Sequence, residues 1–178
     1  MTSTRHTWLA ALICCWALSG CLLEPFSGSE VVLELGTASL AASDIASDDN
    51  EHYALYAVMV ETESLVLIDR FYIDDQLDAR SYPDGALLGV ANRPSGGLPE
   101  GGINLKSEAD LADAVGVLLS IERNGETDPA PDAVVARGEL EELNRSVLSG
   151  DLEGGVPRLD GGTAALVNSR VAIIIQEP

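Results

Sequence analysis

The chain has 178 residues, of which 29 are acidic and 10 are basic, and its formal net charge is -19 at pH 7. This balance argues against nucleic acid as a partner, because neutralising phosphates requires clustered lysine and arginine side chains, and Lys106 is the only lysine. The acidity is typical of a surface kept soluble by charge repulsion, with a specific cationic partner as the alternative. The length suits one domain that buries its own core.

The N-terminal segment has the pattern of a secretory signal peptide. Residues 1–7 carry Arg5 and no acidic residue, and residues 8–18 form an unbroken apolar run. An uncleaved transmembrane helix is the alternative, but the apolar or small residues 7–23 are fewer than the roughly 20 that a spanning helix requires. We therefore expect a signal peptide over residues 1–20 that is helical before cleavage.

The apolar run closes with Leu18-Ser19-Gly20-Cys21. This tetrapeptide resembles the lipobox of bacterial lipoproteins, in which the cysteine is acylated and becomes the first mature residue. The resemblance implies that Leu18, Ser19 and Gly20 are recognised as the processing signal and that Cys21 carries the lipid. Each buried acyl methylene contributes about 0.8 kcal/mol to membrane binding, so we expect the domain to be anchored to the membrane by its N-terminal lipid.

Two neighbouring features refine this location. Leu22 and Leu23 stand where an aspartate retains enterobacterial lipoproteins in the inner membrane, so the family's rule favours the outer membrane of a bacterial cell envelope. All three cysteines lie in the signal or at the cleavage point, so the exported domain must fold without a disulfide. Cleavage removes Arg5 and leaves nine basic and 29 acidic side chains, a formal net charge of -20.

The exported chain begins with a tether, a strand and an acidic loop. Residues 21–30 form the lipidated tether, and the alternation over residues 31–35 predicts a half-buried strand. The polar stretch over residues 41–51 predicts a loop. Its carboxylates are calcium candidates because calcium prefers oxygen ligands, but they lack the Asp-x-Asp-x-Asp-Gly spacing, so we expect no metal and no cofactor. The candidates are Asp44, Asp48, Asp49 and Glu51.

Two apolar runs mark the expected centre of the core. Residues 53–60 and 65–73 are rich in β-branched and aromatic side chains, and a short polar link joins them. This pattern predicts an antiparallel hairpin. Both faces of residues 53–60 are apolar, so we expect this strand in the interior of a sheet, with Leu55 buried.

The remaining elements are short. Residues 83–85 predict a turn, residues 86–91 one short strand, and the capping-box spacing of Ser107 and Asp110 a short helix over residues 107–114. Alternating patterns predict strands over residues 115–122, 133–138 and 165–175, with a turn at Asn124-Gly125. Residues 140–150 fit a helix, and a strand over residues 147–152 is the alternative.

Short strands separated by turns predict a mainly β domain over residues 31–178, an antiparallel Ig-like β-sandwich with one or two short helices. Its Tyr-Ala-Leu-Tyr-Ala strand, its Phe-Tyr-Ile strand and residues 117–125, 128–131 and 138–140 resemble the extracytoplasmic C-terminal domain of anti-sigma-K factors. The resemblance implies a β-sandwich fold. It carries no binding residue across, because the family's cytoplasmic sigma-binding segment has no counterpart here.

The chemistry of the exported residues is sparse. His52 is the only histidine after the signal, so a zinc site with two histidines is excluded within one chain. No Gly-x-Ser-x-Gly turn supports a serine hydrolase. We expect His52 to be exposed at the start of a strand, and we predict no catalytic residue.

These observations favour a membrane-anchored extracytoplasmic lipoprotein whose domain is a non-enzymatic interaction or envelope-structural module, with an unidentified envelope protein as partner. One alternative is a sensory or regulatory accessory domain, suggested by the anti-sigma resemblance. The other is a hydrolase that uses paired carboxylates, such as Asp74 with Asp75 or Glu141 with Glu142.

Overall fold

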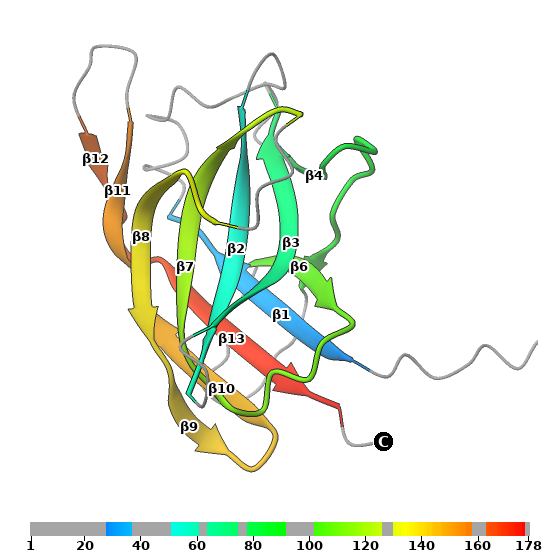
Figure 1. Ribbon diagram of the computed structural model, residues 1–178, viewed down its shortest axis with the longest axis vertical. Coiled ribbons are helices and arrows are strands. Elements are labelled where there is room, and N and C mark those ends of the chain that lie inside the picture. The colour runs from blue at the N-terminus through cyan, green and yellow to red at the C-terminus, as the bar shows by residue number, and fades with distance from the viewer. Residues whose placement is uncertain are drawn as a thin grey trace, which may run out of the picture.

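Two antiparallel β-sheets pack face to face in the computed structural model of the chain (Figure 1). The mainly β sandwich predicted from the sequence is therefore confirmed. The described residues contain no helix, and so none that is long and apolar enough to cross a membrane. These residues are 28–36, 51–60, 64–74, 78–91, 102–125, 130–157 and 163–176.

One sheet has six strands and contains both ends of the described chain. Strand β1 lies between β6 and β13, and its register pairs Ser29 with Ile175. The first strand therefore begins beside the end of the last one, at the lower right of Figure 1. In spatial order the strands are β5 (Val90–Ala91), β6 (Gly102–Ser107), β1 (Ser29–Glu34), β13 (Arg170–Ile175), β10 (Val147–Asp151) and β9 (Glu141–Asn144).

The other sheet has seven strands and contains the predicted hairpin. Strands β2 and β3 pair antiparallel, as expected for residues 53–60 and 65–73, and β7 pairs with β2 on its other side. Strand β2 therefore lies in the sheet interior. In spatial order the strands are β12 (Thr163–Ala165), β11 (Glu153–Pro157), β8 (Ala133–Glu139), β7 (Ala114–Arg123), β2 (Glu51–Met59), β3 (Leu65–Ile73) and β4 (Ala79–Ser81).

The hydrophobic core lies between the sheets, which run obliquely to each other in Figure 1. Leu55 is fully buried, as predicted, and the rings of Tyr53 and Phe71 stack with centroids 5.4 Å apart. Strand β1 faces this core with Leu33, but Val32 on its other face is also buried. The prediction of a half-buried first strand is therefore wrong.

The short helix predicted over residues 107–114 is absent, because tertiary contacts hold this segment in turns. Ser107 Oγ accepts the backbone N–H of Ala109 at 3.2 Å, a local bond that also occurs in turns outside helices. Ser29 Oγ accepts the N–H of Leu111 at 3.4 Å, and the Leu111 side chain is fully buried. Burying this leucine outweighs the capping pattern.

The C-terminal third also departs from the sequence pattern. Residues 140–150 form strands β9 and β10, so the strand alternative is confirmed and the helix is wrong. The single last strand predicted over residues 165–175 is divided into β12 and β13. Asn168 lies between them with φ 55°, a left-handed conformation that asparagine tolerates, and it lets the chain cross from one sheet to the other.

Candidate functional site

The chain changes sheets at residues 138–141, between the end of β8 and the start of β9. Close backbone approach at this corner depends on two glycines. A Cβ atom on Gly138 would lie 2.7 Å from the carbonyl oxygen of Asp151, and one on Gly150 would overlap the carbonyl oxygen of Glu139. Strand β10 therefore passes this near to β8 only because both positions lack a side chain.

A groove of about 1100 Å³ opens beside this corner. It runs over β7 and β8, and the apolar residues of its floor include Val115, which is 43% exposed, and Val134, which is 36% exposed. Val115 precedes Gly116, which pairs with Glu139 at one end of the β7–β8 ladder, whereas Val134 pairs with Ser120 towards the other end. The other apolar residues that line it are Val58, Leu118, Val135 and Leu140, together with Val117 and Ala136, which are buried in the core.

Carboxylates form the rim of this groove. Glu139, Glu141, Asp151 and Glu153 line it, and all four are exposed. Arg137 lines it as well, so the acidic groups outnumber the basic one. A groove with charges of one sign and low-dielectric walls concentrates the electrostatic field and attracts groups of the opposite charge.

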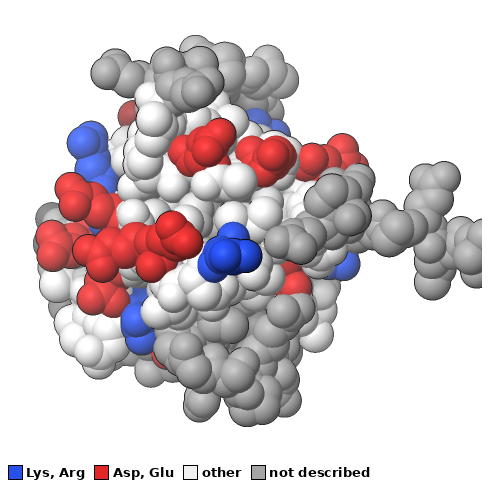
Figure 2. Space-filling view, turned by 90° about the horizontal axis from the view of Figure 1, so that it is seen from below, with Lys and Arg blue, Asp and Glu red and all other residues white. Residues whose placement is uncertain are grey.

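A smaller hollow of about 360 Å³ shares part of this rim and adds Glu142. In the hollow, Arg170 Nε lies 3.1 Å from Asp151 Oδ1, and both side chains are exposed. An exposed pair of this kind contributes little to stability. Figure 2 shows acidic side chains gathered at its left, the side on which β8 and β9 lie in Figure 1.

The rim carboxylates are spread over several strands. Within the described ranges, no three His, Cys, Asp or Glu side chains lie where they could hold a metal ion. Asp44, Asp48 and Asp49 of the predicted calcium set lie outside those ranges, and Glu51 is exposed at the start of β2. The rim therefore presents distributed charges and not a site for a single ion.

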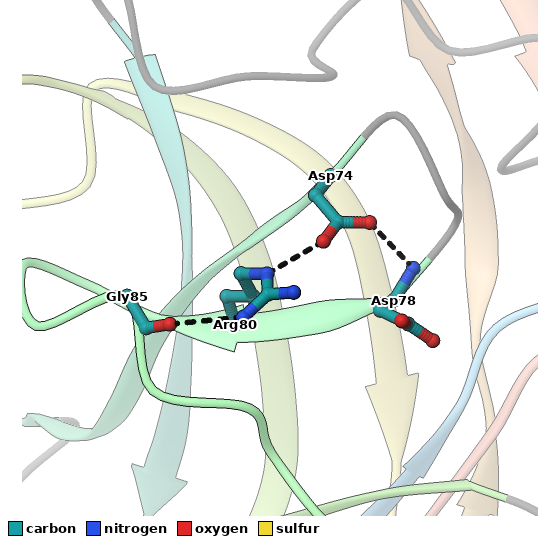
Figure 3. Close-up of polar contacts among 4 residues, drawn as sticks. All are labelled: Asp74, Asp78, Arg80 and Gly85. Atoms are coloured by element: carbon teal, nitrogen blue, oxygen red, sulfur yellow. Dashed lines mark hydrogen bonds and ion pairs between the residues drawn. The ribbon is translucent and has the colours of Figure 1, made fainter.

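A charged contact closes the β3–β4 hairpin at the edge of the seven-stranded sheet (Figure 3). Arg80 Nε donates to Asp74 Oδ2 at 2.5 Å, and Arg80 Nη1 donates to the carbonyl oxygen of Gly85 at 3.2 Å. Asp74 Oδ1 accepts the backbone N–H of Asp78 at 2.9 Å. The hydrogen bond with Asp74 raises the pKa of Arg80. Asp74 thus holds the hairpin together.

A buried polar cluster lies on the face of β2 and β7 that points away from the core. Its members are His52 and Tyr56 on β2 with Ser120 and Glu122 on β7. Glu122 Oε1 accepts the Ser120 hydroxyl and, at 3.4 Å, the Tyr56 hydroxyl, while Glu122 Oε2 accepts the backbone N–H of Asp132 at 3.3 Å. Alternating polar residues usually face solvent, so the sequence pattern did not indicate this cluster.

His52 is only 2% exposed, so the prediction of an exposed histidine is wrong. Its ring stacks on Tyr82 with centroids 3.9 Å apart, and Nδ1 lies 2.9 Å from Asn124 Oδ1. Burial lowers the pKa of His52 and raises the pKa of Tyr56. An amide oxygen only accepts, so neutral His52 carries its proton on Nδ1. These contacts are with an amide and a ring, and they give His52 a packing role.

The predicted lipidation residue Cys21 and the predicted recognition residues Leu18, Ser19 and Gly20 lie outside the described residues. The groove was not predicted, although Gly138 directly precedes the stretch that contains Glu139, Glu141 and Glu142 in the sequence. Comparison of this chain with protein-family models, with curated proteins and with solved structures found no match.

Proposed function

We propose that this chain is a lipid-anchored protein of the bacterial cell envelope whose β-sandwich is a non-enzymatic interaction module. The observation that carries the proposal is Leu18-Ser19-Gly20-Cys21 at the end of an apolar run. Strand β1 begins at Ser29, so the chain from Cys21 spans at most roughly 30 Å. A lipid on Cys21 would hold the sandwich next to the membrane.

The groove supports the interaction role. It combines exposed apolar side chains with a charged rim, and recognition surfaces commonly place polar groups around an apolar centre. Its floor is formed by the paired strands β7 and β8, and it lies beside the corner where Gly138 and Gly150 allow close backbone approach. A surface built on strands is positioned more accurately than one built on loops.

The two alternatives have less support. A hydrolase with two carboxylates needs an acid of raised pKa beside a second acid. Burial raises the pKa of Asp69, but the partners described for its carboxylate are the backbone N–H groups of Arg70 and Lys106. The sensory alternative stays a prediction, because the anti-sigma resemblance supplies a fold and no binding residue.

The location is tested by fractionating cells that produce the full chain or its Cys21→Ala variant. We expect the wild-type protein in the outer-membrane fraction and the variant as a longer, unprocessed precursor, because the acylated residue is missing. Wild-type protein recovered in the cytoplasm with its N-terminal segment intact would contradict the proposal.

The interaction role is tested by site-specific photo-crosslinking in the same cells. A crosslinkable side chain at Val134, in the groove floor, is compared with one at Leu87, which is 62% exposed and does not line the groove. We expect one discrete crosslinked band from position 134 and none from position 87. No band from either position, or equal bands from both, would count against an interaction module that uses this groove.

A further inference from the structure

The floor of the groove leaves apolar surface in water. Val115 and Val134 lie in it with large exposed fractions, and half-buried Leu118 lies in the floor as well. Gly116 and Gly138 also line the groove and add no side chain. A Cβ atom on Gly116 would lie 2.9 Å from the carbonyl oxygen of Gly138, so this close approach of β7 and β8 requires a residue without a side chain. An occupant with small or branched apolar side chains fits such a floor.

The rim determines the charge of that occupant. Glu139 is the last residue of β8 and Glu141 is the first of β9, while Asp151 ends β10 and Glu153 begins β11. The carboxylates therefore come from four strands, against one guanidinium from Arg137. An acidic segment would be repelled here, whereas lysine or arginine side chains would meet carboxylates along the rim.

Because the rim charges are spread over several strands, they suit an extended partner better than a single ion. As noted, the described side chains form no cluster that could hold a metal. The exposed Asp151–Arg170 contact is weak, so a cation of the partner competes with Arg170 at little cost. Floor and rim together match a segment that offers apolar side chains on one face and positive charges at its margins.

We infer that the groove binds a positively charged segment of a partner protein, with apolar side chains of that segment on Val115 and Val134 and its lysine or arginine side chains on the rim. This inference rests on the proposed function, because it names the chemistry of the partner at the same groove. It also favours a specific cationic partner over solubility alone as the explanation for the acidity of the chain.

The test uses the full lipidated protein in nanodiscs of phosphatidylcholine, which carry no net charge. The probe is a short fluorescein-labelled peptide of alternating lysine and valine, and its binding is followed by fluorescence anisotropy against empty nanodiscs. Two further peptides separate the contributions. One alternates lysine and serine and tests the floor, and the other alternates aspartate and valine and tests the rim.

Two variants with equal charge changes locate the binding. Glu139→Gln, Glu141→Gln and Glu153→Gln together neutralise three rim positions. Asp84→Asn, Glu108→Gln and Asp113→Asn together neutralise three exposed positions that do not line the groove. We expect the rim variant to weaken binding of the lysine–valine peptide about tenfold, from three surface charge contacts, and the control variant to stay within about twofold.

A floor variant completes the design. Val115→Thr with Val134→Thr keeps the branched shape that a strand favours and makes the floor polar, so it should weaken lysine–valine binding while lysine–serine binding stays unchanged. Circular dichroism of each variant reports whether it folds.

Several outcomes would overturn the inference. If the rim and control variants weaken binding of the lysine–valine peptide equally, the peptide is attracted only by the net charge of the protein and not by the groove. Equal affinity for the lysine–serine and lysine–valine peptides would show that the apolar floor does not contribute to binding. Binding of the aspartate–valine peptide would show that the acidic rim does not determine the charge of the partner. If Val134 crosslinks a partner in cells while the lysine–valine peptide fails to bind, the proposed function stands and this inference fails.

Discussion

At the scale of single residues, His52 shows how burial changes the chemistry that a side chain offers. An imidazole with an ordinary pKa titrates near neutrality, but the buried ring of His52 stacks on Tyr82 and bonds Asn124 Oδ1. Burial is the largest cause of its lowered pKa, with Arg70 adding to it, while the hydrogen bond with Asn124 and the charge of Glu122 oppose it. The folded protein therefore favours the neutral ring.

This preference predicts a pH-dependent stability. Below a pKa of about 6.5 the unfolded chain takes up a proton on His52, while the folded protein takes it up only at lower pH. The free energy of unfolding should therefore fall as the pH decreases through the region just below 6.5. Urea denaturation at pH 7.5 and pH 5.5 measures this loss, and His52→Gln should reduce it. An identical loss in the variant would show that His52 does not titrate as described.

At the scale of elements, the β2–β3 hairpin was predictable because its two apolar runs carry their own signal. Periodicity and composition alone placed both strands and the burial of Leu55. Prediction was wrong where the pattern competed with contacts from distant residues. Ser107 had a helix-capping pattern, but Ser29 and the buried Leu111 hold that segment in turns, and no local sequence rule reports a contact across such a separation.

The two faces of this hairpin should differ in their contribution to stability. Leu55 is fully buried in β2, whereas Leu67 in the neighbouring strand is 37% exposed. Leu55→Ala should lower the free energy of unfolding by about 2–5 kcal/mol, because it leaves a cavity in the core. Leu67→Ala should cost less than half as much, because its side chain already contacts water. Urea denaturation of both variants measures the difference, and equal costs would contradict the placement of β2.

The edge strand β4 should depend on Asp74, which joins Arg80 Nε to the backbone N–H of Asp78 (Figure 3). Asp74→Ala removes both contacts, so the amides of β4 should exchange hydrogen for deuterium faster while the amides of central strand β7 keep their rates. Asp74→Asn retains an acceptor without the charge and should give an intermediate rate. Unchanged exchange in β4 of the alanine variant would show that the hairpin holds without this contact.

At the scale of the whole molecule, the positions of the chain ends and the groove determine how the domain would face the membrane. Strand β1 begins beside the end of β13, and β9 lies at one edge of the same sheet, three strands away from β1. A tether of roughly 30 Å or less would leave the groove accessible from the side of the sandwich. The acidic surface would also repel an anionic membrane over about one Debye length, near 8–10 Å.

The groove itself was beyond prediction from the sequence. It runs over β7 and β8 beside the corner where β9 and β10 approach β8, and Gly138 and Gly150 allow these close backbone approaches. These glycines are visible in the sequence, but which segments come together depends on the strand order of both sheets. Acidic residues were also too abundant for any one group of them to stand out. The pattern Leu18-Ser19-Gly20-Cys21, in contrast, is local, so the sequence alone can suggest it, and the lipidation it implies stays a prediction.

The central claim, attachment through a lipid on Cys21, is tested most directly by the intact mass of the protein extracted from the envelope. The account predicts a chain that begins at Cys21 and is heavier than the polypeptide by the mass of its acyl groups. A chain that retains residues 1–20 and has the unmodified polypeptide mass would contradict it.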